Sequence, residues 1–498
     1  MNIIEIYKKN ATERDHYVEE AQLISELTIP SICPRASQGN SNYNYGNNEA
    51  NNPRKLRRPK SSAPARGVNS LSATLTSTLN PPNIQFFRFI YDPTLTLSQE
   101  SQDMVNDIYH GYEKKVESFL AKFNFFAFSN SLTKRCLIEG NVGCKVDVER
   151  GFMLYPLRCI QIKRSFGTKY YAIFEESILK PDPDDKNVMR PYRQYIYVDY
   201  KKNEVLTQQE DQEQAKKTDE LASQYIVAVT ELPVDESYGR SFYIDYYGLL
   251  KSIDQAATAL EEAQLNCSWN WISFSGPSNI PTDRIAKIKN RQVVRLPNHE
   301  MVHWQGTGQK ISDWQFVNQM LIEKEQAIQY ISAAGLVAKA GSMQTAYEVS
   351  QVRQELDSLV GSVAQVLAEE YYKAVVEAVV EVLGIRQELQ DALMAANINV
   401  TQEQLKKLIQ PIVISGVPAM AREQEAQKML QGAQSIMATF GPVATPIFDI
   451  QEFAKEYFDG LKVNTKFIRT KEDVQAMMQQ AQQGQPTNTP MMNGGPTS

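Results

Sequence analysis

The sequence predicts an α+β fold in which an antiparallel sheet region is followed by long helices. Segments between residues 143 and 229, such as CKVDVE and QYIYVDY, alternate or cluster β-branched and aromatic residues, as strands do. After Pro233, apolar residues recur every three or four positions, which is the spacing of a buried helix face. With 498 residues, the chain is too long for a single core and is expected to form several packed regions.

The N-terminal region is predicted to be mostly helical. Residues 3–27 carry apolar residues at helical spacing, and Pro30 follows as a helix stop. The next segment, residues 38–52, is rich in Asn and Gly and is expected to be a surface loop. Three further helices are predicted over residues 66–79, 102–123 and 129–138.

A basic stretch separates that loop from the next helix. It holds six Lys and Arg residues between Arg54 and Arg66, and no acid occurs between Glu49 and Asp92. One interpretation is a patch that contacts phosphates. The other is a solvated loop that repels its own copies or meets an acidic neighbour. The sequence leaves both interpretations open.

The sheet region is predicted to be interrupted by two segments. The first contains Pro181-Asp182-Pro183, which favours a loop. The second, residues 204–220, is strongly charged and is expected to be a loop or a local helix. The strands themselves should pair antiparallel.

After Pro233 two helices flank a compact β segment. The first helix has an apolar stripe and is expected to extend to about Cys267. Short strands are predicted in the segments WISF and QVVRLP, and a second helix begins near Ser312. A β module carried on two helices suggests a projecting part and not the core of an enzyme.

The C-terminal half is predicted to contain one very long helix. It follows a stretch of small residues, SAAGLVAKAGSM, with a single charge at Lys339. Thr345 and Glu348 have the spacing of a capping box, and the helix is expected to run to Leu383, about 58 Å at 1.5 Å per residue. Later elements are a strand over residues 411–416, helices over residues 419–440 and 449–461, and a disordered tail over residues 476–498.

The composition argues against several classes of protein. A net charge of −6 is unlike that of a polycation that wraps DNA. The five cysteines include no CxxC pair, which argues against a disulfide framework or a thiolate zinc site. Because no apolar run reaches the roughly 18–20 residues of a membrane span and the N-terminus lacks a signal-peptide pattern, we expect a soluble intracellular protein with no membrane partner.

Two common enzyme motifs are missing from the sequence. Gly306, Gly308 and Lys310 lie close together, but the GxxxxGK[ST] spacing of a phosphate-binding loop does not occur. No GxSxG motif occurs either. We therefore expect no catalytic residues and no cofactor, so any ATPase that works with this chain must be another protein.

One segment mimics a metal site. His299-Glu300-Met301-Val302-His303 matches HExxH, in which two histidines one helical turn apart bind zinc. That motif needs a stable helix, whereas Pro297-Asn298 precede the match and glycines follow it closely. We predict a hairpin instead, with Val293-Val294 and Val302-x-Trp304 as its strands, and no bound metal. A zinc metallopeptidase is the remote alternative.

Five segments of the chain together indicate a family. They are TIPSICP at residues 28–34, RGVNSL at 66–71 with LNP at 79–81, EGNV at 139–142, ESYGRS at 236–241 and TAYEV at 345–349. These segments resemble the portal, or head-to-tail connector, proteins of short-tailed bacteriophages (podoviruses), in a consistent order that covers residues 1 to about 470. The ESYGRS segment is the most specific, because it is similar to a signature at the start of the first channel-lining helix.

The resemblance implies the portal fold, with a wing, a helical stem, a small α/β clip and a helical crown. The order of helix, β module and helix that the bare sequence predicts agrees with stem, clip and stem. The implied regions are the wing at residues 1–240 and 345–420, stem helices at 241–268 and 311–333, the clip at 269–310, the tunnel loop at 334–344, the crown at 421–470 and a flexible tail at 471–498.

The resemblance also implies a ring of twelve copies at one capsid vertex of the virion, assembled in the host cytoplasm. Double-stranded DNA would pass through the channel during packaging and ejection. The implied partners are the terminase large subunit, tail adaptor or nozzle proteins, and the major capsid and scaffolding proteins. Another ring-shaped head-tail adaptor of the virion is the alternative.

Three sets of site residues follow from this resemblance. The stem would line the channel with a mildly negative wall that lets DNA slide, and the tunnel loop would touch phosphates through Lys339. The stem set is Asp245, Lys251, Asp254, Glu261, Glu262, Glu323 and Glu325. The tunnel-loop set is Lys339, Ala340, Gly341, Ser342, Met343 and Gln344. The clip set, for docking partners, is Arg284, Lys287, Lys289, Arg291, His299 and Glu300.

Overall fold

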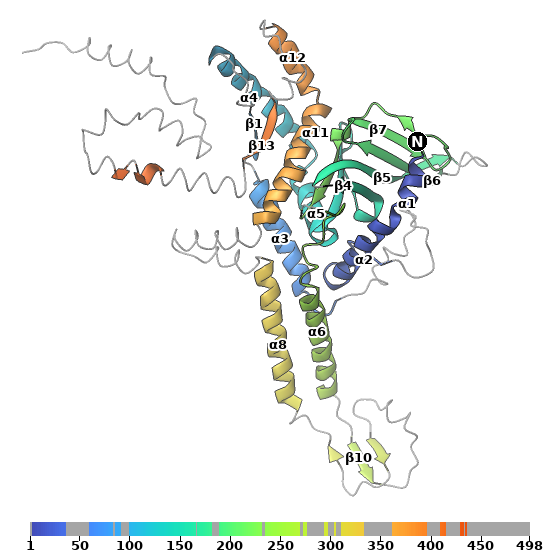
Figure 1. Cartoon of the computed structure of the whole chain (residues 1–498). Helices are drawn as coiled ribbons and strands as arrows, with labels where there is room; N and C mark the ends of the chain where they lie inside the picture. Colours follow the sequence, from blue (N-terminus) through green and yellow to red (C-terminus); the bar gives the residue numbers. More distant parts are fainter. Residues whose placement is uncertain are drawn as a thin grey trace, which may run out of the picture. The chain divides into compact units, whose positions relative to one another are not determined.

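The chain divides into two compact units, residues 1–416 and 417–498. All the elements below belong to the first unit, and in the second only the helical residues 429–432 and 434–435 are described. The structure is a computed structural model (Figure 1). In the first unit it describes residues 2–35, 59–82, 85–90, 99–165, 167–181, 189–231, 235–268, 272–275, 293–296, 303–304, 310–332, 361–395 and 409–414.

The N-terminal region is helical, as predicted, but its first helix is split. Asn10 separates the two parts, and its side-chain amide donates a hydrogen bond to the Tyr171 hydroxyl at 3.2 Å. The later helices begin three or four residues earlier than predicted, because Pro64 fits the first turn of one and Asn124, with φ of 49°, starts another. The helices are α1 (Ile3–Lys9), α2 (Ala11–Leu27), α3 (Ala63–Leu79), α4 (Gln99–Lys122) and α5 (Phe125–Glu139).

The predicted antiparallel strands form two sheets. The three-stranded sheet has the order β3-β2-β9, and the five-stranded sheet runs β4-β5-β6-β7-β8, every neighbouring pair being antiparallel. Short 3-10 turns at Leu157–Cys159 and Ala222–Gln224 precede β4 and β9. The strands are β2 (Asn141–Asp147), β3 (Gly151–Tyr155), β4 (Ile160–Ser165), β5 (Thr168–Pro181), β6 (Met189–Asp199), β7 (Glu204–Gln209), β8 (Lys216–Lys217) and β9 (Tyr225–Val229).

The prediction of a loop or local helix over residues 204–220 is wrong for residues 204–209 and 216–217, whereas residues 210–215 and 218–220 are loop. This segment contributes β7 and β8 to the five-stranded sheet. Val205 is buried and pairs with Val198 of β6, and Leu206 packs against the core cluster on the other face of the sheet, so the strand has apolar residues on both faces.

The five-stranded sheet is covered on both faces. Phe174 and Val198 pack toward the three-stranded sheet and α2, whereas Ile173 and Tyr195 pack against Ile3 of α1 on the other face. Figure 1 shows α1 and α2 beside this sheet. The alternation of neighbouring residues between two buried faces explains why the strands contain so few exposed polar positions near their centres.

The two helices predicted after Pro233 are α6 (Tyr247–Ser268) and α8 (Lys310–Ile331). Between them in the sequence lies a three-stranded sheet in which β10 (Ile272–Ser275) is the central strand. It pairs parallel with β11 (Val293–Leu296) and antiparallel with β12 (His303–Trp304). The predicted hairpin of the last two strands is therefore wrong, because β10 lies between them.

The long helix ends near Leu383, as predicted, where Gly384 adopts φ of 65°. Residues 361–367 are helical, and a π-helical turn, Ala368–Lys373, leads into α11 (Ala374–Val382). After α12 (Ile385–Ala395), the predicted strand appears as β13 (Gln410–Val413) and pairs with β1 (Phe87–Ile90), a strand that the sequence did not predict. Residues 345–360 and the tail lie outside the described residues.

Candidate functional site

The helices α6 and α8 form a pair, lying side by side and running in opposite directions (Figure 1). Their inner faces are apolar. Leu250 and Ile253 of α6 and Leu321 and Ile328 of α8 are buried. Apolar packing therefore holds the part of the pair formed by residues 250–253 and 321–328.

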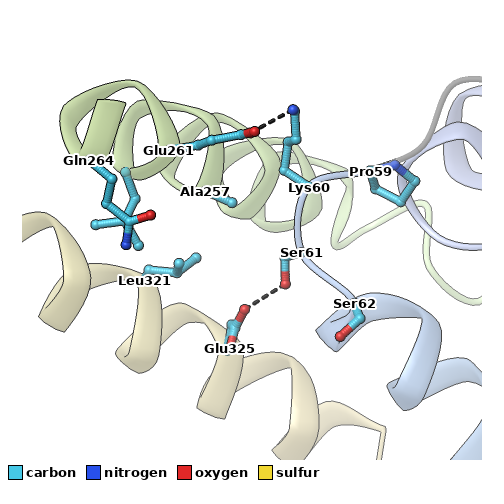
Figure 2. Close-up of a pocket in the computed structure, with 10 residues that line it drawn as sticks. Pro59, Lys60, Ser61, Ser62, Ala257, Glu261, Gln264, Leu321 and Glu325 are labelled. Atoms are coloured by element: carbon cyan, nitrogen blue, oxygen red, sulfur yellow. Dashed lines mark hydrogen bonds and ion pairs between the residues drawn. The ribbon is translucent and has the colours of Figure 1, made fainter. Parts of the chain in front are cut away.

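A short segment before α3 contacts both helices of the pair (Figure 2). The backbone N–H of Lys60 donates a hydrogen bond to the Asp254 carboxylate at 3.0 Å, and its ammonium lies 2.5 Å from a Glu261 oxygen. The Ser61 hydroxyl donates to the Glu325 carboxylate at 2.5 Å. We call Lys60 and Ser61 the clasp, because they join α6 to α8.

The clasp lies beside an open pocket between the two helices (Figure 2). Asp254 is only 8% exposed, whereas Lys60 and Glu261 have about half of their side chains exposed, at 47% and 50%. The exposed ion pair therefore adds little stability. The backbone hydrogen bond to Asp254 fixes the position of the clasp more strongly, because its acceptor is a buried charged group.

The structure divides the predicted stem residues into two groups. Asp254, Glu261 and Glu325 contact the clasp within their own chain. The others have exposed side chains: Asp245, Lys251, Glu262 and Glu323. The basic stretch had two interpretations. Lys60 supports contact with an acidic neighbour, because its ammonium lies beside the Glu261 carboxylate. Residues 54–58 lie outside the described part of the chain.

The segment that leads into α6 is fixed to the turn after α5. The side-chain amide of Asn141 donates to the Gly239 carbonyl at 2.6 Å, and its oxygen accepts from the Gly239 N–H at 2.9 Å. A Cβ at Gly140, where φ is 75°, would lie 2.6 Å from the backbone of Gly239 and Arg240. Only glycine can occupy this position without moving the backbone.

Further contacts hold the same segment. The Ser241 hydroxyl and the Phe242 N–H both donate to the Leu137 carbonyl, at 2.9 and 3.1 Å. Tyr238 accepts a hydrogen bond from the Ile162 N–H at 3.1 Å, and its ring stacks on that of Tyr17. The start of α6 is therefore attached to α5, β4 and α2. We call residues 236–242, with Gly140 and Asn141, the anchor.

A charge-assisted hydrogen bond links Tyr17 of α2 to a side chain of the anchor. The Tyr17 hydroxyl donates to the Glu236 carboxylate at 2.6 Å. This bond lowers the pKa of Glu236, and Arg240, 3.1 Å away, acts in the same direction. Burial raises the pKa of Tyr17, so this hydroxyl remains a hydrogen-bond donor at neutral pH.

The end of α8 is held near the same place. Ser332 shares a hydrogen bond of 3.1 Å with the Tyr243 hydroxyl. On its other side, a Cβ at Gly67 of α3 would lie 2.5 Å from the Ser332 hydroxyl oxygen. The absence of a side chain at Gly67 therefore allows α3 to approach the end of α8 closely.

Comparisons with known proteins identify the family of the chain. The sequence model of the family described as bacteriophage head to tail connecting protein matches residues 1–168 and 199–468. The chain belongs to this family. Both halves of the anchor, at Gly140 and at residues 236–242, lie within the matched connector sequence.

Two curated relatives of this connector chain are portal proteins. That of Enterobacteria phage T3 is 22% identical over 513 aligned residues, which cover 95% of this chain and 89% of the relative. That of Escherichia phage T7 is 22% identical over 468 residues, which cover 85% of this chain and 80% of the relative.

The EGNV and ESYGRS segments of the connector chain were recognised separately in the sequence. The structure brings them together, since Asn141 and Gly239 are hydrogen-bonded although 98 residues separate them. Sequence reasoning missed the clasp. The sequence carried part of the information, because Lys60 belongs to the basic stretch and Pro64 marks the start of the next helix. The neighbouring residues in the sequence did not show that Asp254, Glu261 and Glu325 are the partners of the clasp.

Several predicted residues of the connector lie outside the described part of the chain. This holds for the whole tunnel-loop set, from Lys339 to Gln344, and for the clip residues Arg284, Lys287, Lys289, Arg291, His299 and Glu300. Of the HExxH match, His303 is described and lies in strand β12, whereas the zinc motif requires both histidines on one helix.

Two searches of the described residues bear on other classes of site. No helix among them is long and apolar enough to cross a membrane. Among the same residues, no group of three or more His, Cys, Asp or Glu side chains has a metal-binding arrangement.

A buried charge cluster lies between the sheets and the π-helical turn of the connector. The Lys169 ammonium is 2.6 Å from a Glu370 oxygen, and Arg164, with its side chain fully buried, is 3.5 Å from the same atom. Burial lowers the pKa of both Lys169 and Arg164. The two cations therefore share one carboxylate in a site with little water.

Proposed function

We propose that the chain is a portal subunit, of which twelve copies form a ring at one vertex of the capsid. Its action is structural and not enzymatic. The observation that carries the proposal is the helix pair of α6 and α8. The anchor, built from two connector-family segments, holds this pair, and the small β module lies between the two helices in the sequence. The names of the curated relatives point to the same role.

In this proposal α6 and α8 belong to the stem, and strands β10, β11 and β12 belong to the clip. The elements up to β9, together with the π-helical turn, α11 and β13, belong to the wing. Tail adaptor or nozzle proteins and the terminase large subunit dock at the clip, and capsid and scaffolding proteins contact the outside of the ring. The tunnel loop and the crown are assigned to residues 334–344 and 421–470.

The channel wall of the stem needs exposed charges that DNA can pass without binding. Because Asp254, Glu261 and Glu325 are occupied by the clasp, the wall candidates are Asp245, Glu262, Glu323 and Lys251. Three negative charges against one positive charge leave −2 per subunit. A weakly negative wall repels phosphates, so double-stranded DNA slides during packaging and ejection.

Electron microscopy of the purified protein tests the proposal. Closed rings with a central hole, formed without nucleotide, are expected. Gold labelling of the protein in virions should then mark a single vertex. Monomers alone at micromolar concentration across salt conditions would contradict the ring, and labelling at the tail but not at the vertex would favour another head-tail adaptor.

Lys339 gives a separate test of the channel. In the proposed ring, the tunnel loops would present twelve lysines to the DNA. Lys339→Glu should leave stability and ring assembly nearly unchanged, because an exposed charge costs little in folding. It should impair DNA packaging or retention, measured as the length of DNA in purified heads. Full-length genomes, packaged and kept as in the wild type, would reject this role for Lys339.

A further inference from the structure

The hairpin of β4 and β5 places two cations directly opposite each other. A β-bulge shifts the register after Lys163, so that Arg164 pairs with Lys169. Cross-strand partners lie on the same face of a sheet, and like charges in this arrangement repel each other. A bulge redirects side chains in this way and is common beside functional sites. The hairpin therefore needs negative charge on this face.

The π-helical turn supplies one carboxylate to the two cations. Both contact the same Glu370 oxygen, Lys169 at 2.6 Å and Arg164 at 3.5 Å. Two positive charges and one negative charge leave a net charge of +1 in the cluster. Because Arg164 is only 2% exposed, water screens this excess charge poorly, and leaving it unbalanced would be costly.

Arg164 also has hydrogen-bond donors without acceptors. Its side chain is fully buried, yet none of its three guanidinium nitrogens donates a hydrogen bond to any residue that the structure describes. The separation of 3.5 Å from Glu370 makes an ion pair but is too long for a well-formed hydrogen bond. Buried donors in folded proteins are nearly always paired, with protein groups, water or ions. The guanidinium therefore needs an acceptor, and the excess charge favours one that is negative.

The polar groups near Arg164 in the described part of the chain do not supply that acceptor. The Tyr200 hydroxyl donates to the Tyr225 carbonyl at 3.0 Å. Burial raises the pKa of Tyr200 and of the Cys136 thiol, so both groups are neutral. Glu377 of α11 is the next acid along the helix, and the charged side chain with which it interacts most strongly is Lys373.

We propose that Arg164 and Lys169 bind a small monovalent anion, of the size and charge of chloride, beside the π-helical turn. Such an ion accepts hydrogen bonds from several donors at once and cancels the net charge of +1. The side chains of Lys169 and Glu370 are 20% and 23% exposed, so the ion can enter from solvent at this edge. Once bound, it ties the β4–β5 hairpin to the helix that contains the π-helical turn. All of its ligands belong to one chain, so the site does not depend on the proposed ring.

The wild-type chain tests the ion without any substitution. Unfolding in urea, which adds no ions, is measured while chloride replaces the larger anion gluconate at constant ionic strength and constant protein concentration. Once chloride exceeds its dissociation constant, each tenfold increase in chloride should raise the folding equilibrium constant about tenfold. Identical unfolding curves in the two salts, as expected if water alone pairs with Arg164, would overturn the proposal.

Substitutions in the cluster should change the response to chloride in opposite directions. Glu370→Gln raises the net charge to +2 and should lower the dissociation constant of chloride, taken from the same curves, by roughly tenfold. The matched control is Glu369→Gln, at a side chain that is 67% exposed, and it should respond as the wild type does. Arg164→Met and Lys169→Met bring the net charge to zero and should abolish the response. If these two variants do not fold, equal dissociation constants in Glu370→Gln and Glu369→Gln would still reject the site.

Bromide locates the ion directly, because it replaces chloride and scatters X-rays anomalously. Crystals of the full chain grown in bromide should show an anomalous peak within hydrogen-bond distance of the Arg164 guanidinium. A peak at this place without any effect of chloride on unfolding would indicate an adventitious ion only, and would overturn its role in joining the hairpin to the helix. The absence of a peak at this place would overturn the site itself.

Discussion

The sheet region and the helix pair hold their charged residues in opposite ways. In the sheet region the side chain of Arg164 is fully buried, and Glu370 binds both it and Lys169. In the helix pair, the Lys60–Glu261 contact has both side chains about half exposed. A buried charge left without its partner costs several kcal/mol, whereas an exposed pair contributes little. The cluster around Glu370 should therefore tolerate no loss of a charge, while the exposed Lys60–Glu261 pair can be lost and the subunit remain folded.

The largest expected effect is at Glu370. Glu370→Gln leaves the Arg164 and Lys169 charges buried without a counter-charge, and should lower the free energy of unfolding by about 3–5 kcal/mol. Glu369→Gln is the control, because this neighbouring side chain is 67% exposed. Urea denaturation of both variants measures the difference. Equal, small losses would show that the buried cluster contributes no more than a surface charge.

The pH dependence of Glu370→Gln should sharpen the same contrast. Burial already lowers the pKa of Lys169, and losing the carboxylate lowers it further. The folded variant then binds fewer protons at Lys169 than the unfolded chain does, so its stability should rise as the pH is raised toward about 10, the ordinary pKa of an unfolded lysine. Denaturation at several pH values checks this, with Glu369→Gln expected to show the wild-type dependence.

The anchor should give an intermediate effect. Gly140→Ala places a methyl group 2.6 Å from the backbone of Gly239 and Arg240, at a φ of 75° that alanine disfavours. We expect a loss of about 1–3 kcal/mol in thermal or chemical denaturation. Gly111→Ala, in open helical space, should be neutral or slightly stabilising. A stable Gly140→Ala variant would mean that the turn and the ESYGRS segment can separate without cost.

The clasp should give the smallest effect. Ser61→Ala removes one hydrogen bond to Glu325, and should cost about 0.5–1.5 kcal/mol. Lys60→Ala should cost less than about 1 kcal/mol, and 1 M salt should abolish most of that difference because the ion pair is exposed. A loss at Lys60 comparable with that at Glu370 would remove the distinction between the two regions.

The sequence predicted those parts of the fold that depend on local pattern. The strands around Ile162 and Phe174 and the helices α6 and α8 follow from residue spacing alone. The β7 strand was missed because its charged neighbours masked Val205. The central position of β10 and the pairing of β1 with β13 depend on contacts between distant segments, which a single sequence does not reveal.

The site was predicted to a smaller extent for the same reason. The resemblance identified the EGNV and ESYGRS segments and the stem acids, but not that Asn141 binds Gly239. The clasp joins residues about 200 positions apart, as in Lys60 and Glu261. Charge type alone could not show whether Asp254 faces a channel or the backbone of its own chain.

The π-helical turn at Ala368–Lys373 keeps a row of apolar residues on one face of the helix. Buried residues recur there at intervals of four, at Leu367, Tyr371, Val375 and Val379. In a regular α-helix each interval of four overshoots a full turn by about 40°, so the row would wind away from the sheets within a few turns. The additional residue in the π-helical turn takes up this overshoot. Deleting one residue there would restore ordinary helical geometry and keep both halves of the row on one face, because eleven α-helical steps of about 100° make about three full turns.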